Sequence, residues 1–286
     1  MKQPTKIAFQ GEPGANSHIA ISEAYPTAEP LPCPTFEDAL AAITSGEADL
    51  GMIPIENSVA GRVADIHHLL PESGLFIVGE YFLPIQHQLM APRGARLAEL
   101  RTVESHVQAL GQCRRMIRRL GLRPIVAVDT AGSARLVAER GDKSCASIAS
   151  RLAAEIYGLD ILAEDVEDET HNTTRFVVLA REENWAKQGS GPLVTTFVFR
   201  VRNLPAALYK AMGGFATNGV NMTKLESYMV DGNFFATQFY ADVDGHPDDK
   251  NLAFALEELQ FFSREFRIVG VYPGHPFRAT FSEKAE

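Results

Sequence analysis

The chain has few cysteines and no long apolar run, and both shortages limit what kind of protein it can be. Cys33, Cys113 and Cys145 lie far apart in 286 residues, with no pair at the spacing of a metal site. We therefore expect reduced thiols, with neither a disulfide nor a structural zinc. No apolar run approaches the ~20 residues of a membrane span, and residues 1–5 lack the apolar core of a signal peptide. The sequence predicts a cytoplasmic protein with no membrane partner.

Positive charge is also scarce. With 27 lysines and arginines against 36 acidic residues, the net charge of -9 leaves no basic surface of the kind that nucleic acids require. The one basic cluster, within residues 114–119, is interpreted as a solvated helix face. The chain is 45% hydrophobic and 22% charged, so it can bury a substantial core, and its length predicts two domains.

Strands and helices alternate as far as about residue 180, which predicts a doubly wound α/β region. Strands are expected at 6–10, 48–55, 75–90 (with a break at Pro84), 102–104, 124–128 and 144–149. Helices are expected at 36–45 and 106–120. Further helices are expected to begin at 16, to end near 70, and to follow residues 129 and 149. The crossing near residue 80 and the return near 165 predict two lobes with a cleft between them, where small anions bind in such folds. A polar stretch at 181–192 is interpreted as a linker.

The C-terminal region predicts a second, smaller domain. Strands are expected at 195–201, 222–228, 233–242 and 266–272, and helices at 205–217 and 248–263, with a turn at 230–232. This order, βαββαβ, is typical of a ferredoxin-like fold.

Polar side chains gather where predicted strands begin or end. Thr174 and Arg175 directly precede the apolar run 177–179, so a rigid strand would support a hydroxyl donor and a planar guanidinium suited to a carboxylate. By themselves these residues, like Asn57 and Ser58, are more often strand or helix caps, and His106 in a first helical turn is usually a surface residue. The turn Gly11–Gly14 is a weak anion signal and does not predict nucleotide binding.

Several separated stretches resemble the prephenate dehydratase family, over nearly the whole chain. They are Gly11-Glu12-Pro13-Gly14 with Ser17, residues 54–61 (PIENSVAG), residues 104–110 (ESHVQAL) and residues 172–176 (NTTRF), followed by a region similar to an ACT domain. The resemblance implies a periplasmic-binding-protein-like catalytic region at 1–182 and an ACT regulatory domain at 193–275. It also implies the conversion of prephenate to phenylpyruvate, with no fused chorismate mutase domain and no metal or organic cofactor.

The resemblance implies a role for each matching residue. Thr174 matches the family's catalytic threonine, and its weakly acidic hydroxyl would act as an oriented donor to the leaving oxygen. Because prephenate is a dicarboxylate and the chain is acidic, local donors must recognise it. The expected substrate-binding residues are Ser17, Glu56, Asn57, Ser58, His106, Asn172, Arg175 and Phe176.

The ACT resemblance implies phenylalanine as an effector, bound between subunits of a homodimer or homotetramer. The expected effector residues are Ala207, Leu208, Asn218, Asn221, Met222, Glu226 and Ser227, with Asn203 and Leu204 beside them. Here the chain departs from the family pattern, because Tyr228-Met229 replaces an Arg-Pro pair and Ala206 replaces a glycine. We expect phenylalanine still to bind between two ACT domains and to inhibit, with an altered affinity.

Two other functions compete with prephenate dehydration. An arogenate dehydratase would perform the same chemistry on the aminated substrate, and the sequence does not distinguish the two. A non-catalytic amino-acid sensor is the other alternative. The intact Thr174-Arg175-Phe176 stretch and the lack of a DNA-binding segment count against a sensor.

Overall fold

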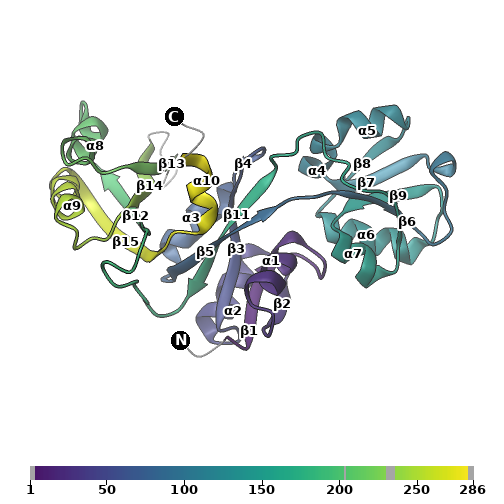
Figure 1. The fold of residues 1–286 in the computed structure, drawn as a ribbon, viewed down its shortest axis with the longest axis horizontal. Helices are drawn as coiled ribbons and strands as arrows, with labels where there is room; N and C mark the ends of the chain where they lie inside the picture. Colours follow the sequence, from purple (N-terminus) through teal and green to yellow (C-terminus); the bar gives the residue numbers. More distant parts are fainter. Residues whose placement is uncertain (1–3, 203, 230–235, 283–286) are drawn as a thin grey trace. The chain divides into compact units, whose positions relative to one another are not determined.

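The computed structural model describes residues 4–202, 204–229 and 236–282 (Figure 1). Contacts divide the chain into two compact units: unit 1 is Met1–Val63 with Phe82–Phe176, and unit 2 is Ala64–Tyr81 with Val177–Glu286. The strands β5 (Phe76–Pro84) and β11 (Thr173–Ala180) belong partly to each unit. The ranges 1–182 and 193–275 therefore remain a prediction about domains. No helix within the described ranges is long and apolar enough to cross a membrane.

The first lobe of unit 1 is built on β1 (Lys6–Gln10), β2 (Glu29–Cys33) and β3 (Leu50–Asn57), with β1 in the middle and parallel to both neighbours. The helices α1 (Asn16–Ala24) and α2 (Phe36–Ser45) pack on these strands, and β4 (Gly61–Arg62) pairs with the end of β3. β2 was not predicted, because Pro30 and Pro32 argue against a strand. They are tolerated here because β2 is the last strand of its sheet.

The second lobe of unit 1 has five strands in the order β10-β6-β9-β7-β8. Their bounds are β6 (Gln88–Ala91), β7 (Thr102–His106), β8 (Arg123–Ala127), β9 (Cys145–Ala149) and β10 (Asp160–Ala163). β7, β8 and β9 are parallel, whereas β6 and β10 run antiparallel to their neighbours. A short helix, η1 (Leu97–Glu99), precedes β7. The two lobes confirm the predicted fold of this region.

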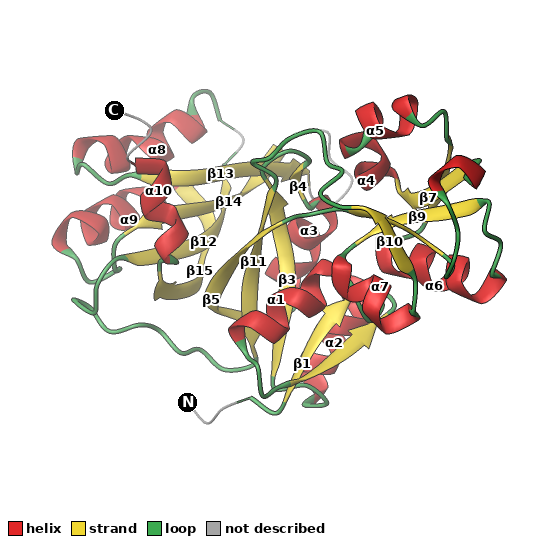
Figure 2. Cartoon of the chain, turned by 45° about the vertical axis from the view of Figure 1, so that its right-hand side comes forward, coloured by secondary structure: helices red, strands yellow, loops and turns green. Residues whose placement is uncertain are grey.

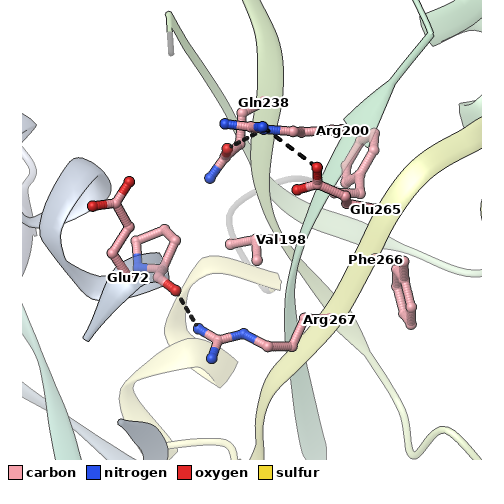
Figure 3. A pocket seen from close by; sticks show the side chains of 9 residues that line it. Glu72, Val198, Arg200, Gln238, Glu265, Phe266 and Arg267 are labelled. Carbon is pink, nitrogen blue, oxygen red and sulfur yellow. Dashed lines mark hydrogen bonds and ion pairs between the residues drawn. The ribbon is translucent and has the colours of Figure 1, made fainter. Parts of the chain in front are cut away.

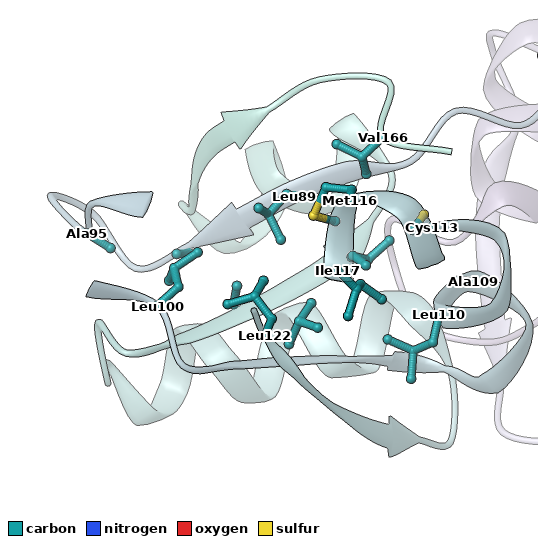
Figure 4. Close-up of a cluster of buried hydrophobic side chains, with 14 residues drawn as sticks. Leu89, Ala95, Leu100, Ala109, Leu110, Cys113, Met116, Ile117, Leu122 and Val166 are labelled. Atoms are coloured by element: carbon teal, nitrogen blue, oxygen red, sulfur yellow. The ribbon is translucent and has the colours of Figure 1, made fainter. Parts of the chain in front are cut away.

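Alternating side chains divide the second lobe into two cores. Leu89 packs with α4 (Val107–Gln112) and α5 (Arg114–Arg119) in the cluster drawn in Figure 4, to which Ile148 also belongs. The neighbouring Met90 and Ala149 pack with α6 (Thr130–Arg140) and α7 (Arg151–Tyr157). The sheet is therefore covered on both faces. The predicted helix 106–120 is divided at the buried Cys113, which leaves helical geometry with φ -121° and ψ 26°.

Unit 2 contains the predicted ferredoxin-like fold (Figure 2). Its antiparallel sheet has the order β13-β14-β12-β15, formed by β12 (Leu193–Val201), β13 (Met222–Met229), β14 (Ala236–Asp244) and β15 (Ser263–Pro273). The helices α8 (Ala207–Thr217) and α9 (Lys250–Phe262) cover one face through Phe197 and Phe199. The predicted turn 230–232, the start of the strand predicted from 233, and Asn203 lie outside the described residues.

The other face of this sheet packs against α3 (Ala64–Glu72), the helix that precedes β5 in the chain. The rings of His67 and Tyr240 lie 5.2 Å apart in an edge contact. At the C-terminal end, η2 (Pro276–Arg278) and α10 (Ala279–Ser282) follow β15, and Arg278 donates two hydrogen bonds to the buried carboxylate of Glu80. The ferredoxin-like sheet is therefore enclosed on both sides within unit 2.

Candidate active site

Asn57 and Thr174 meet where β3 ends and β11 begins, because the two strands are neighbours in the sheet. The Asn57 Nδ2 donates to Thr174 Oγ1 over 2.9 Å and to Asn172 Oδ1 over 2.7 Å, with a longer contact of 3.3 Å to the main-chain oxygen of Thr173. Asn172 is buried, while Asn57 and Thr174 are half-buried. The structure thus brings together three of the residues predicted to form the site.

The direction of the bond between Asn57 and Thr174 is fixed. The Asn57 Oδ1 accepts hydrogen bonds from the main-chain N–H groups of Val59 (3.0 Å) and Ala60 (2.8 Å). Since a main-chain N–H only donates, the oxygen must face this turn and the amide nitrogen must face Thr174. The Thr174 oxygen is therefore an acceptor, and within the described residues no group accepts its hydroxyl proton. That proton is available for a molecule outside the protein.

Ser58 closes the junction from the other side. Its hydroxyl donates to the main-chain oxygen of His171 over 2.7 Å and accepts from the N–H of Thr173 over 2.9 Å, and its own N–H donates to the Thr173 oxygen. These bonds clamp the segment before β11 and use the hydroxyl proton of Ser58. Asn57 is the last residue of β3 and Ser58 begins the turn that follows, so neither caps a helix, since α3 begins only at Ala64.

Arg175 leaves β11 on the face opposite to Thr174, because successive side chains of a strand alternate. Its side chain is only 3% exposed, its Nη1 donates to Glu56 Oε1 over 2.9 Å, and the guanidinium carbon lies 6.0 Å from the centre of the Phe82 ring. Glu56 likewise precedes Asn57 on β3, so the two strands pair Glu56 with Arg175 and Asn57 with Thr174. Phe176, also predicted at the site, is fully buried.

Two residues that the sequence did not indicate extend this cluster. The Gln112 Oε1 accepts from Asn172 Nδ2 over 3.0 Å and lies 2.8 Å from the Nε2 of His87. His87 is 3% exposed, and burial lowers the pKa of its imidazole. Its main-chain N–H donates to Glu167 over 2.9 Å. Neither residue has a local sequence signal, because Gln112 ends a helix and His87 precedes a strand.

Ser17 and His106 take other positions. Ser17 is buried in the first turn of α1, and His106 precedes α4, where its Nδ1 accepts from the N–H of Gln108 over 3.4 Å. Within the described residues no hydrogen bond joins either side chain to Thr174 or Asn57. In the glycine turn, the Gly14 N–H donates to His18 Nδ1 over 3.1 Å, so this donor is already used. The roles of Ser17 and His106 at the site remain predictions.

The residues predicted to bind an effector surround α8 and β13 in unit 2. Asn218 follows α8 and donates to the Gly214 oxygen over 2.8 Å, and Asn221 donates to Asp244 over 2.7 Å. Glu226 accepts from Lys224 over 3.3 Å, and Ser227 is exposed. The partly buried apolar members of the set pack against the core below the helices: Ala207, Leu208 and Met222.

Tyr228, which stands where the family pattern has arginine, is a core residue. It is 5% exposed, its hydroxyl accepts from Gln238 Nε2 over 3.0 Å, and its ring lies edge-on to His68 at 5.2 Å. Burial raises the pKa of Tyr228 to about 12. The following Met229 is 51% exposed. The replacement thus puts a neutral buried phenol at this position of β13.

Cavities are also present in the described part of unit 2, and two of them are well defined. One, of about 310 Å³, lies beside α3 (Figure 3); its lining includes Pro71, Glu72, Val198, Arg200, Gln238, Glu265 and Arg267. Its two arginines are engaged, Arg200 with Gln238 and Glu265, and Arg267 with the main-chain oxygen of Pro71. The other, of about 410 Å³, is lined in part by Asn221, Asp244, Asp249 and Lys250. Neither unit, as far as it is described, has a cluster of three or more potential metal ligands.

Comparison with known proteins identifies the family of this chain. The family model described as prephenate dehydratase matches residues 7–184. A Komagataeibacter europaeus protein named bifunctional N-acyl-homoserine lactone acylase/prephenate dehydratase is 53% identical over 272 residues, covering 95% of this chain and 97% of its own. Arogenate dehydratase/prephenate dehydratase 1 of Arabidopsis thaliana is 39% identical over 94% of this chain and 72% of its own.

A solved structure extends the match to the C-terminal region. The crystal structure of prephenate dehydratase in complex with L-Phe from Arthrobacter aurescens is 30% identical and has a TM-score of 0.86, covering 98% of this chain and 97% of its own. With a family match over more than half of the chain and relatives that match 94% or more of it, this protein belongs to the prephenate dehydratase family and is a dehydratase, an enzyme of the lyase class.

Proposed function

We propose that this enzyme converts prephenate to phenylpyruvate, a step towards phenylalanine, with Thr174 as the catalytic donor. The observation that carries the proposal is the hydroxyl of Thr174, whose oxygen is held by Asn57 and whose proton has no acceptor within the described residues. In the reaction the ring carboxylate leaves as carbon dioxide, its electron pair completes the aromatic ring, and the ring hydroxyl leaves with a proton as water.

Thr174 acts on the leaving hydroxyl. A threonine hydroxyl is too weak an acid to protonate an alcohol fully, so it donates a hydrogen bond that strengthens as negative charge develops on the departing oxygen. The side-chain amide of Asn57 donates a hydrogen bond to the Thr174 oxygen. This bond polarises the threonine hydroxyl and makes it a better donor to the leaving oxygen. Aromatisation supplies the driving force. Solvent then restores the proton to Thr174.

Recognition of the two substrate carboxylates requires local hydrogen-bond donors at the site. The protons of Asn57 and Ser58 are committed to protein acceptors, so these two residues shape the site. The candidates are Arg175, which also donates to Glu56 within the protein, Ser17 and the N-terminus of α1. We assign Arg175 to substrate orientation from β11.

The test is direct conversion of prephenate by the purified enzyme, measured by the absorbance of phenylpyruvate and run beside arogenate. Arogenate is the alternative substrate because relatives in Arabidopsis carry both names. Faster turnover of prephenate supports the proposal, and faster turnover of arogenate would transfer it to the aminated substrate. Turnover of neither compound would overturn the proposal.

A second activity is favoured by the relative that is 53% identical and is named as an acylase as well as a dehydratase. We propose hydrolysis of the amide bond of N-acyl-homoserine lactones as a second candidate. Release of free homoserine lactone, measured by mass spectrometry, tests it. Thr174→Ala provides the control, because loss of both activities would place them in one site and loss of dehydration alone would separate them.

We further propose that phenylalanine regulates the enzyme through the ferredoxin-like region of unit 2. The relative solved in complex with L-Phe supports this, since it matches 98% of this chain. The buried Tyr228 removes the positive charge that the family pattern places on β13, so we expect a changed affinity. Inhibition requires tighter binding to one state of the enzyme, and about 1–3 kcal/mol of coupling suffices.

Calorimetry and an activity titration with phenylalanine separate the outcomes. Binding accompanied by inhibition supports this regulation. Binding without inhibition would show that the effector site is uncoupled, and no binding at millimolar phenylalanine would show that the changes at Tyr228 and Met229 have abolished it. Ultracentrifugation with and without phenylalanine tests the predicted homodimer or homotetramer.

A further inference from the structure

A continuous series of side-chain hydrogen bonds runs from Thr174 to His87 within unit 1. It passes through Asn57 and Asn172 over 2.7 Å, Asn172 and Gln112 over 3.0 Å, and Gln112 and His87 over 2.8 Å. Asn57 lies on a strand of the first lobe, whereas Gln112 and His87 belong to the second lobe. The series therefore links the threonine to the second lobe.

Each bond in this series has only one possible direction. The N–H groups of Val59 and Ala60 fix the oxygen of Asn57, so its nitrogen donates to the oxygen of Asn172. The nitrogen of Asn172 must then donate to the oxygen of Gln112. This oxygen faces His87, so the imidazole must carry its proton on Nε2 and donate it. Reversing any amide would place two donors against each other.

We propose that His87 is a positioning residue for Thr174, acting as a neutral Nε2–H donor that holds Gln112 and, through Asn172 and Asn57, sets the direction of the threonine hydroxyl. Its burial and the anchoring of its main-chain N–H to Glu167 keep the ring in place. The lowered pKa of the buried imidazole is consistent with a neutral ring. The proposal rests on the proposed function of Thr174, and it adds a residue that touches no reacting atom.

Two amide substitutions form a matched test. In His87→Gln the amide nitrogen falls near the position of Nε2 and can still donate to Gln112, whereas in His87→Asn it falls near Nδ1 and cannot reach. We expect His87→Asn to lower kcat about tenfold or more with KM changed less than about threefold, and His87→Gln to stay within about threefold of the wild type. Equal losses in both variants, or a loss confined to KM, would overturn the proposal.

The Thr174→Ala background separates positioning from general damage. If His87 acts only by directing the threonine hydroxyl, His87→Asn should cost less than about twofold when this hydroxyl is already absent. A further loss of about tenfold in the double variant would show that His87 acts elsewhere. Melting temperatures of all variants show whether they are folded when they are compared.

A spectroscopic measurement keeps this inference distinct from the proposed function. In enzyme labelled with ¹⁵N-histidine, nuclear magnetic resonance should show His87 as the Nε2–H tautomer at neutral pH, with its signals assigned by their absence in His87→Gln. The Nδ1–H tautomer or a charged imidazolium would overturn the proposal even if the enzyme turns over prephenate. Lack of turnover would instead overturn the function and leave this result intact.

Discussion

The amide of Asn57 donates a 2.9 Å hydrogen bond to the hydroxyl oxygen of Thr174, although 117 positions separate the two residues in the chain. Because the Asn57 oxygen is held by two main-chain N–H groups, the threonine can only accept from this partner. Its proton is left for the substrate. The proposed chemistry depends on this one-directional pair.

Replacing Thr174 by alanine should lower kcat by about 10²-fold or more and change KM only a few-fold, because the hydroxyl acts mainly in the transition state. Thr174→Ser should retain much of the activity, since it keeps the donor. Steady-state kinetics with prephenate checks both variants. Near-wild-type turnover by the alanine variant would show that Thr174 is not the donor.

Asn57→Asp tests the direction of the hydrogen bond between Asn57 and Thr174, because aspartate has nearly the same shape as asparagine. A carboxylate cannot donate to the Thr174 oxygen, so it would accept the threonine proton and divert it from the substrate. We expect kcat to fall by about 10²-fold. Asn251→Asp, at an exposed position of α9, is the matched control and should leave kcat unchanged. An active Asn57→Asp enzyme would contradict the assigned direction.

Arg175→Lys distinguishes a substrate clamp from a structural ion pair. A lysine offers a point charge in place of the planar fork, so KM for prephenate should rise if Arg175 orients a carboxylate. If the pair with Glu56 is its whole role, KM should stay constant while the melting temperature falls, because Arg175 is 3% exposed. Kinetics and thermal unfolding of the same preparation separate the two results.

Gly14 should tolerate no side chain. Its φ of +89° is unfavourable for other residues, and a Cβ atom would lie 2.7 Å from the Cα of Ala153. We expect Gly14→Ala to lower the free energy of unfolding by about 2–4 kcal/mol. Gly121 has a φ of +64° with no atom within 4 Å of the added carbon, so Gly121→Ala should cost only about 1 kcal/mol. Equal effects in urea unfolding would contradict the predicted clash.

The pair of Glu12 and Arg135 predicts a pH dependence of stability. Two hydrogen bonds of 2.6 and 2.9 Å from Arg135 lower the pKa of the Glu12 carboxyl below its ordinary 4.5. The stabilisation is therefore present above pH 4.5 and is lost as the pH falls through the lowered pKa. Both side chains are about one-third exposed, so we expect only about 0.5 kcal/mol. Urea unfolding of wild type and Glu12→Gln should differ at neutral pH and converge in acid.

The regular parts of the fold could be predicted from the sequence. Alternating apolar runs and caps predicted most helices and strands, and the succession of strands and helices along the C-terminal region, βαββαβ, predicted its ferredoxin-like fold. β2 was missed because its two prolines suit only an edge strand, and a linear sequence does not show which strand is last. The division of the helix at Cys113 also depends on packing.

The candidate site was predicted only in part, because its contacts are non-local. Thr174, Asn57 and Asn172 were predicted from motifs, and the structure brings them together. Gln112 and His87 were not, since their hydrogen bonds join segments 25 and 60 positions apart without any local pattern. Thr174 and Arg175 point to opposite faces of the sheet because successive side chains of a strand alternate, although the two residues are neighbours in the motif.

The central claim is most directly tested by comparing wild type, Thr174→Ala and Thr174→Ser in a single-turnover reaction with prephenate, with enzyme in excess. The account predicts rapid formation of phenylpyruvate by the wild type, a rate within about tenfold of it for the serine variant, and a rate lower by about 10²-fold or more for the alanine variant. Equal rates for the wild type and the alanine variant would contradict it.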